Sequence, residues 1–405
     1  MHIVIFVDYH DSTVGGVQTS VRGQRKGLEE LGHTVTIVSP PPVGRKETDP
    51  HCVTVPATPF RPNGFPMVLP TKRNMKYIQA ALDQLGPIDI IHVQTNMGIG
   101  MMGVKIARKL SVPLVQTMHG RDDVFAQDTF PLPYITTTFL KFFHQRYVPH
   151  TSEVHRLTDN GTAHNAWQIM VSQAQAADCV VMPSHHFKEK FREHGVMRPM
   201  EVISNGISDD VVASLPQKLK PTPKRKSPLK VIWCGRLSTE KRPLESIEAV
   251  RAIEGASLDL YGNGPLEKTI QEYITANNLG DRIHLKGRVS QSEILAAMWD
   301  HDVLLYPSYG FDNQPMVLIE AVAASVPVIY CDPDLTECMP KEGALITDGI
   351  SVEALTHSLQ YLQDTPKARQ KMHKAMFDHR NKIVQSYHSK KMITLYKRVI
   401  KKYKS

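Results

Sequence analysis

The stretch S-Y-G-F-D-N-Q-P-M-V-L-I-E-A, from Ser308 to Ala321, decides how this chain is interpreted. It follows Val303 to Tyr306, a short apolar run that predicts a buried strand. Apolar residues then recur at helical spacing from Met316, which predicts a helix after the strand. Asp312 lies at the entrance of this helix and Glu320 lies two turns deeper, so both carboxylates can line one rim of a cleft and bind hydroxyl-rich ligands. The alternative is an N-capping Asp312 with a surface Glu320.

The composition predicts a globular protein of two domains. The chain has 405 residues, of which 41% are hydrophobic and 22% charged, and at this length a single core has stopped growing. Its five cysteines include no C-x-x-C pair, which predicts reduced core thiols in a cytosolic protein. The start, M-H-I-V-I-F-V-D, predicts a first strand and no signal peptide. No run of about 18 apolar residues occurs, so the sequence predicts no membrane-spanning helix. We therefore expect a cytoplasmic protein.

The net charge of +8 predicts an anionic partner. Nucleic acid is not expected, because no zinc-finger, RNP-type or G-x-x-G motif with interleaved aromatic residues occurs. Nucleotide diphosphates and anionic lipid headgroups remain. Although there are 19 histidines, none has the H-E-x-x-H or H-x₃-H spacing, so we predict no metal site and no cofactor.

Strand-like runs alternate with helical segments along the whole chain, which predicts parallel βαβ units. The lysine- and proline-rich segment from Ser214 to Pro228 has no periodicity and indicates a domain boundary. The predicted fold is α/β, with two doubly wound parallel sheets and a ligand cleft between the domains. Residues 1–208 form the first domain and 209–383 the second, and a basic helix at about 384–405 packs back on the first.

Several loops that follow predicted strands carry residues suited to an anionic or hydroxyl-rich ligand. Paired glycines before a helix allow close backbone approach, and free N–H groups at a helix N-terminus attract anions. Two cations on one such loop suit a diphosphate. The residues in question are Gly15-Gly16, His119, Gly235-Arg236 with Glu240-Lys241, and Gly262-Asn263-Gly264-Pro265.

Taken together and in this order, these motifs and the acid–seven–acid pair resemble the retaining GT-B glycosyltransferases, a family that includes bacterial mannosyl-, glucosyl- and N-acetylglucosaminyltransferases. The segments Pro183-Ser184 and Ser204-Asn205-Gly206 are also similar to segments of that family. The resemblance covers nearly the whole chain. It implies two Rossmann-like domains, a nucleotide-diphosphate sugar as co-substrate (UDP- or GDP-linked) and no metal.

The resemblance also implies a role for each matching residue. Arg236 and Lys241 would hold the donor diphosphate and stabilise the charge on the leaving nucleotide. Glu320 would bind the ribose, Asp312 a sugar hydroxyl and His119 the transferred sugar. Further donor contacts would come from the glycines Gly15, Gly16, Gly235, Gly262 and Gly264, from the backbone of Arg288-Val289 beside the base, and from Met316 and Val317 at the helix entrance.

This chain departs from the family pattern at the first acid. The family usually has glutamate followed by Gly-aromatic-Gly, whereas here Asp312 is followed by Asn313-Gln314-Pro315. Aspartate reaches about one bond less far, and Pro315 has no N–H to offer a ligand. The departure affects the sugar identity more than phosphate binding.

The first domain carries residues that predict the acceptor. Phe139, Leu140, Phe142 and Phe143 form an apolar group with basic flanks, which either packs on the domain or contacts a membrane. Lys72, Arg73 and Lys76 add positive charge, and Thr95-Asn96 resemble the acceptor-side turn of lipid glycosyltransferases. We expect a membrane lipid acceptor, such as diacylglycerol or a glycolipid, on an anionic surface at the inner face of the cell membrane. A cell-wall or polysaccharide acceptor is the alternative.

Two other functions remain open. A GT-B fold also serves nucleotide-sugar epimerases, and a non-enzymatic scaffold could use the basic surface to bind membranes or nucleic acid.

Overall fold

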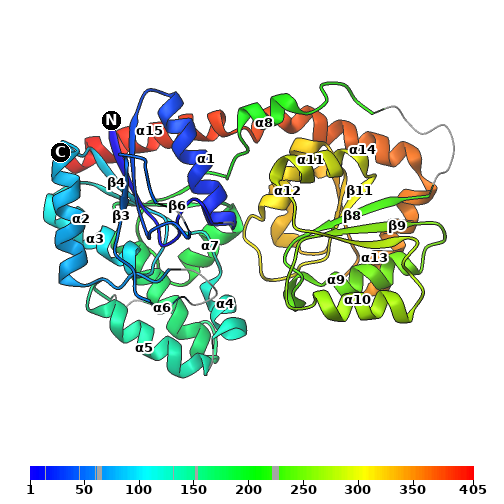
Figure 1. Ribbon diagram of the computed structural model, residues 1–405, viewed down its shortest axis with the longest axis horizontal. Helices are drawn as coiled ribbons and strands as arrows, with labels where there is room; N and C mark the ends of the chain where they lie inside the picture. The colour runs from blue at the N-terminus through cyan, green and yellow to red at the C-terminus, as the bar shows by residue number, and fades with distance from the viewer. Residues whose placement is uncertain are drawn as a thin grey trace. The chain divides into compact units, whose positions relative to one another are not determined.

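The computed structural model describes residues 1–13, 15–44, 46–59, 61, 66–130, 132–150, 154–220 and 228–405. Two parts of motifs from the sequence analysis lie outside the described residues. They are Val14, which precedes the paired glycines, and residues 221–227 of the boundary segment. The chain forms two compact units, Met1–Ser204 together with His388–Ser405, and Asn205–Tyr387. Each unit is a parallel sheet covered by helices on both faces (Figure 1).

The first unit contains a seven-stranded sheet in the order β3-β2-β1-β4-β5-β6-β7, and every strand pair is parallel. The strands are β1 His2–Phe6, β2 Thr34–Ser39, β3 Cys52–Thr54, β4 Ile90–Val93, β5 Leu114–Thr117, β6 Cys179–Met182 and β7 Met200–Val202. The helices are α1 Gly16–Glu30, α2 Lys72–Gln84, α3 Gly98–Leu110, α4 Asp122–Thr129, α5 Pro133–Gln145, α6 Gly161–Gln175, α7 His185–Glu193 and most of α15 Gln385–Lys404.

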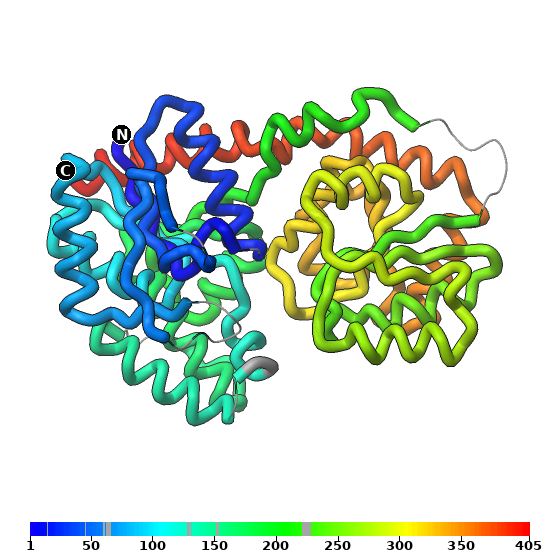
Figure 2. The backbone as a smooth tube through the Cα atoms, viewed as in Figure 1, coloured from blue at the N-terminus to red at the C-terminus, as the bar shows by residue number. Residues whose placement is uncertain are grey.

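The core of the first unit has two layers because alternate residues of a strand point to opposite faces. Val4 and Phe6 of β1 pack in the layer that holds α3 and α6, whereas Ile3 and Ile5 pack in the layer that holds α1 and α15. The C-terminal helix is held by the buried Tyr396. Its hydroxyl lies 2.6 Å from His92 Nδ1 on β4. Both chain termini accordingly lie in this unit (Figure 2).

The second unit repeats the same design with six parallel strands in the order β10-β9-β8-β11-β12-β13. The strands are β8 Lys230–Cys234, β9 Ser257–Tyr261, β10 Ile283–Gly287, β11 Val303–Tyr306, β12 Val328–Tyr330 and β13 Ala344–Ile346. The helices are α8 Asp209–Ser214, α9 Pro243–Arg251, α10 Glu267–Ala276, α11 Gln291–Asp300, α12 Met316–Ala324, α13 Val352–Asp364 and α14 Pro366–His379. Short 3-10 turns are η2 Thr239–Lys241, η3 Pro333–Cys338, η4 Lys341–Gly343 and η5 Arg380–Lys382.

The strand order places a ligand position in each unit. In each sheet the chain builds strands on one side of the first strand and then returns to build strands on its other side. The switch point therefore lies between β1 and β4 in the first sheet, and between β8 and β11 in the second. Open α/β sheets bind ligands beyond the carboxyl ends of the strands at this point. The predicted α/β class with two doubly wound parallel sheets is confirmed. A capping box of Ser290 and Glu293 opens α11.

Candidate functional site

A lysine and an aspartate meet at the switch point of the second unit. Lys241 ends η2 in the loop after β8, and its ammonium Nζ lies 2.5 and 2.6 Å from the two carboxylate oxygens of Asp312. Asp312 follows β11, the strand hydrogen-bonded to β8. Both side chains are largely buried, at 15% and 12% exposure. The parallel pairing therefore brings together two charges that are 71 positions apart in the chain.

Two hydroxyls complete the surroundings of Asp312. Its Oδ2 accepts hydrogen bonds from Tyr306 at 2.5 Å and from Ser308 at 2.7 Å. Burial, followed by the neighbouring Asp312 charge, raises the pKa of Tyr306 well above its ordinary value, so the phenol keeps its proton and remains a donor. The alternative of Asp312 as a helix cap is wrong, because the N-cap of α12 is Pro315 and no side chain caps it. The sequence singled out neither hydroxyl, although both lie in or beside the stretch that it marked.

Gln314, which stands where the family has its aromatic residue, has a structural role. Gln314 Oε1 accepts a hydrogen bond from the backbone N–H of Asn205 at 2.7 Å. Asn313 beside it is buried. The departure from the family pattern thus anchors the Ser204-Asn205-Gly206 segment to the loop before α12.

The loops after β8 and β9 pack on each other backbone to backbone. A Cβ atom on Gly262, which has a φ of +134°, would lie 1.8 Å from the Gly235 carbonyl oxygen. A Cβ on Gly264 would lie 2.5 Å from the Leu237 carbonyl oxygen. The expectation that these two glycines make room for a ligand is therefore corrected, since they make room for the neighbouring loop. Arg236, on that loop, is exposed.

Glu320 is not the surface residue of the alternative interpretation. Its Oε1 accepts a hydrogen bond from Gln291 Nε2 of α11 at 2.8 Å. Burial raises the pKa of this carboxyl, and the bond from Gln291 opposes that shift. Gln291 was missed by the sequence reasoning because nothing in its spacing relates it to Glu320. The remaining predicted donor contacts follow β10 or open α12: Arg288 is exposed, whereas Val289, Met316 and Val317 are partly buried against the core.

In the first unit the paired glycines open α1 as predicted. Gly15 is the N-cap and Gly16 the first helical residue. A Cβ on Gly16 would meet no atom within 4 Å, so the protein itself does not require glycine there. This is consistent with the predicted approach of a ligand to the helix N-terminus.

Thr95 has a different role from the predicted one. Its hydroxyl donates to the Asp8 carboxylate at 2.5 Å and accepts from the Asp8 N–H at 3.0 Å. The same carboxylate accepts from the Ile99 N–H at the start of α3. Thr95 therefore fixes the loop after β4, and we withdraw it from the acceptor contacts. Asp8, which the sequence marked only as the end of a strand, organises this loop.

Asn96 lies beside Asp122, a carboxyl group that the sequence analysis missed. Asn96 Nδ2 donates to Asp122 Oδ2 at 2.5 Å. Burial, opposed by this bond and reinforced by the charge of Asp123, raises the pKa of Asp122 to about 6. The residue is therefore a candidate base near neutral pH.

His119 is held as a neutral ring. Its Nε2 lies 2.7 Å from Gln94 Oε1, and Gln94 Nε2 donates to Gln24 Oε1 at 2.6 Å. Because Gln94 Nε2 donates to Gln24, Gln94 Oε1 faces His119 as an acceptor. The proton of His119 therefore lies on Nε2 and is donated to Gln94. Burial lowers the pKa of His119 to about 4. The Nε2 donor of His119 serves Gln94, and the expected contact of His119 with the transferred sugar stays a prediction.

The apolar group on α5 is divided between the core and the surface. Phe143 packs against the core and against Tyr147, with ring centroids 5.4 Å apart, so we withdraw it from the membrane contacts. Other residues of this helix and its N-cap form an exposed stripe at spacings of three and four, which defines one helical face. We call it the α5 stripe; its members and exposed fractions are Leu132 70%, Ile135 62%, Phe139 66% and Phe142 60%.

Exposed cations lie on the neighbouring helices α2 and α3. Lys72, Arg73 and Lys76 are exposed on α2. Lys109 of α3 donates to Gln79 of α2 at 2.5 Å, which ties the two helices together. Lys105 of α3 instead donates to the Arg146 carbonyl at the end of α5, at 3.0 Å.

Comparison with known proteins agrees with this geometry. Residues 14–211 match the model of Glycosyltransferase Family 4 and residues 216–378 that of Glycosyl transferases group 1. An alpha-monoglucosyldiacylglycerol synthase of Acholeplasma laidlawii is 24% identical over 353 residues, covering 85% of this chain and 83% of that protein.

Solved structures show the same fold. Sucrose-phosphate synthase from Thermosynechococcus elongatus superposes with a TM-score of 0.72 at 18% identity, covering 98% of each chain. Anabaena HepE in complex with UDP and glucose has a TM-score of 0.69 at 14% identity, covering 98% of this chain and 99% of that one. This chain belongs to the GT-B glycosyltransferases with family 4 and group 1 domains, enzymes that transfer a sugar from a nucleotide sugar.

Proposed function

We propose that this chain is a retaining, metal-independent hexosyltransferase that moves a sugar from a UDP- or GDP-linked donor to the hydroxyl of a membrane lipid, such as diacylglycerol or a glycolipid. It works as a peripheral protein on the inner face of the cell membrane. The observation that carries the donor part is the pairing of Lys241 with Asp312 at the switch point of the second unit. The α5 stripe and the Acholeplasma laidlawii relative support the lipid acceptor.

The donor chemistry follows from the charges in the second unit. Transfer breaks the bond between the anomeric carbon and the diphosphate, and negative charge develops on the leaving nucleotide. Lys241 and the exposed Arg236 supply positive charge there without a metal ion. Glu320 accepts from the ribose hydroxyls, and Asp312 holds a sugar hydroxyl while it orients Lys241.

Asp312 is not proposed as a nucleophile. Its carboxylate is neutralised by Lys241 and accepts from two hydroxyls, which makes it a poor nucleophile. Retention is what the resemblance to retaining enzymes implies. Without a protein nucleophile it requires the acceptor oxygen to attack the face that the diphosphate leaves, and a departing phosphate oxygen takes the acceptor proton.

Turnover of a panel of nucleotide sugars tests the donor assignment. We expect nucleotide release from one UDP- or GDP-sugar, stimulated by lipid vesicles that contain diacylglycerol. Activity should change less than about twofold in excess EDTA, because Lys241 and Arg236 supply the positive charge that a metal ion would otherwise provide at the diphosphate. Loss in EDTA with rescue by Mn²⁺ or Mg²⁺ would contradict metal independence. Interconversion of the free nucleotide sugar without an acceptor would indicate an epimerase instead.

The lipid acceptor requires the protein to reach a membrane surface. Among the described residues no helix is long and apolar enough to span a bilayer. The α5 stripe offers large apolar side chains for shallow insertion, and the cations of α2 add an attraction of about 1 kcal/mol each near an anionic surface. Salt screens the second contribution and leaves the first.

The double variant Phe139→Ser with Phe142→Ser should lose the salt-resistant part of vesicle binding. Each phenylalanine contributes on the order of 1.5 kcal/mol on burial, so binding at high salt should fall by about 100-fold. Sedimentation with anionic vesicles measures this, and hydrolysis of the donor should remain. Met197→Ser, at an 81% exposed position of the same unit outside α5, is the matched control and should bind as the unmodified protein does. Equal loss in both variants, or unchanged binding of the double variant, would remove the α5 stripe as the contact.

A further inference from the structure

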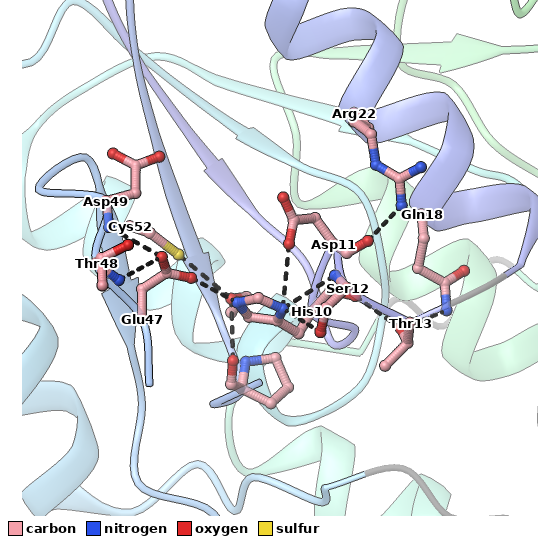
Figure 3. Close-up of polar contacts among 12 residues, drawn as sticks. His10, Asp11, Ser12, Thr13, Gln18, Arg22, Glu47, Thr48, Asp49 and Cys52 are labelled. Atoms are coloured by element: carbon pink, nitrogen blue, oxygen red, sulfur yellow. Dashed lines mark hydrogen bonds and ion pairs between the residues drawn. The ribbon is translucent and has the colours of Figure 1, made fainter. Parts of the chain in front are cut away.

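A cluster of three potential metal ligands lies in the first unit, at the loop between β1 and α1. His10 lies in this loop, Glu47 in the loop after β2, and Cys52 at the start of β3. His10 Nε2 and Glu47 Oε2 are 2.7 Å apart, and the ligand atoms of all three residues lie within 4.8 Å of one another (Figure 3). The His10 side chain is only 1% exposed. Neither the donor chemistry nor the α5 stripe uses any of these residues.

We propose that His10, Glu47 and Cys52 bind one zinc ion that ties the β1–α1 loop to β3. An imidazole, a carboxylate and a thiolate match the ligand types that zinc takes, whereas magnesium and calcium prefer oxygen ligands alone. A zinc site with three protein ligands accepts water as the fourth. Binding releases the thiol proton of Cys52 to solvent, and the ring proton of His10 moves by exchange with solvent from Nε2 to Nδ1, so that Nε2 can bind the ion.

The His10–Glu47 pair must open slightly to accept the ion. Ligand atoms about 2.0 Å from a tetrahedral zinc lie about 3.3 Å from each other, so the His10–Glu47 pair must open by roughly half an ångström. The outer oxygen of Glu47 is already fixed, since Oε1 accepts from the N–H groups of Thr48 at 2.8 Å and Asp49 at 2.9 Å. Oε2 therefore faces His10 and the ion.

The other ring nitrogen of His10 has a carboxylate within reach. Asp11 Oδ1 lies 3.1 Å from His10 Nδ1. Histidines that bind a metal commonly donate their second N–H to a carboxylate, which orients the ring and makes it a stronger ligand. Without the ion this nitrogen is an acceptor, because the Ser12 N–H donates to it at 3.0 Å. Zinc binding at Nε2 therefore requires the ring proton to move to Nδ1 and the Ser12 N–H to turn away, while the Ser12 hydroxyl, 2.8 Å away, can accept from Nδ1.

The site has a structural consequence for the loop that leads to Gly15 and α1. The His10–Glu47 hydrogen bond joins the β1–α1 loop to the loop between β2 and β3, and zinc would add coordination by Cys52 at the start of β3. Because the hydrogen bond persists without the ion, removal of zinc should lower thermal stability and leave turnover nearly unchanged. This is compatible with a donor site that uses no metal, and the inference stands whether or not the lipid acceptor is correct.

Cobalt substitution tests the proposal on the full-length protein. After treatment with a chelator and its removal, the protein is titrated with Co²⁺ and then with Zn²⁺. We expect one ion per chain, a cobalt–thiolate charge-transfer band that zinc abolishes, and a higher melting temperature with zinc. Cys52→Ala should lose the band, whereas Cys179→Ala, which removes a buried thiol of β6 in the same unit, should keep it.

A second variant separates ligation from folding. Glu47→Gln keeps the shape of the side chain and loses its charge, so it should fold and bind zinc at least tenfold more weakly. A band that persists in Cys52→Ala would overturn the assignment. The assignment would also be overturned if the unmodified protein took up no ion and the variants changed stability equally with and without zinc. The cluster would then be a set of hydrogen bonds without a metal.

Discussion

Replacing Lys241 by alanine should reduce sugar transfer by on the order of 10²-fold or more, as the loss of a group that stabilises transition-state charge does. Arg236→Ala should have an effect of the same order. The two variants should differ in stability, because Lys241 is paired with a largely buried carboxylate and Arg236 is exposed. Steady-state nucleotide release and melting curves measure both properties.

A double variant separates charge stabilisation from folding. In Lys241→Ala with Asp312→Asn the uncompensated carboxylate is gone, so melting temperature should recover, while affinity for free UDP or GDP, which Asp312→Asn alone should keep, stays low. Lys268→Ala, at an exposed position of α10 in the same unit, is the matched control and should leave transfer unchanged. Near-normal turnover in both Lys241→Ala and Arg236→Ala would remove the diphosphate assignment.

Exchanging Glu320 for glutamine should weaken nucleotide binding, whereas exchanging Asp312 for asparagine should leave it unchanged. Glu320→Gln should weaken the binding of free UDP or GDP by roughly 10- to 100-fold, as the loss of a charged hydrogen-bond acceptor does. Asp312→Asn should bind the free nucleotide normally and lose transfer, because its carboxylate serves the sugar and Lys241. Calorimetric titration with the nucleotide, together with turnover, measures both.

The control for this pair is Glu272→Gln on α10, an exposed carboxylate paired only with Lys268 among the described contacts. It should behave as the unmodified chain in both measurements. If Asp312→Asn loses the nucleotide and Glu320→Gln keeps it, the two roles are reversed.

The central strand of the second unit that leads to the site could be predicted from sequence because it is a continuous apolar run. Val303–Tyr306 is β11 as predicted. Two strands that the sequence did not single out, Cys52–Thr54 and Met200–Val202, have three residues each and lie at the edges of the first sheet. At that length the pairing partner decides the conformation, and local pattern carries little information.

Strand order was the missing information for the site. Lys241 and Asp312 are each recognisable as residues in a loop after a strand, but their contact depends on β8 lying beside β11. Gly262 and Gly264 were predicted to let a ligand approach the backbone. Close approach of another loop requires glycine in the same way, so the residue type alone could not distinguish the two. His10, Glu47 and Cys52 come together for the same reason as Lys241 and Asp312, since no short spacing relates them.

The anomeric configuration of the product tests the central claim most directly. The protein is incubated with isotope-labelled UDP-glucose, in which glucose is α-linked, or with the sugar nucleotide that the panel selects, and with vesicles that contain diacylglycerol. The extracted lipid is then examined by NMR. We predict a lipid that carries one sugar in the configuration of the donor, formed with an equal amount of free nucleotide diphosphate. A product of inverted configuration would contradict retention, and nucleotide release with no sugar on the lipid would contradict the proposed acceptor.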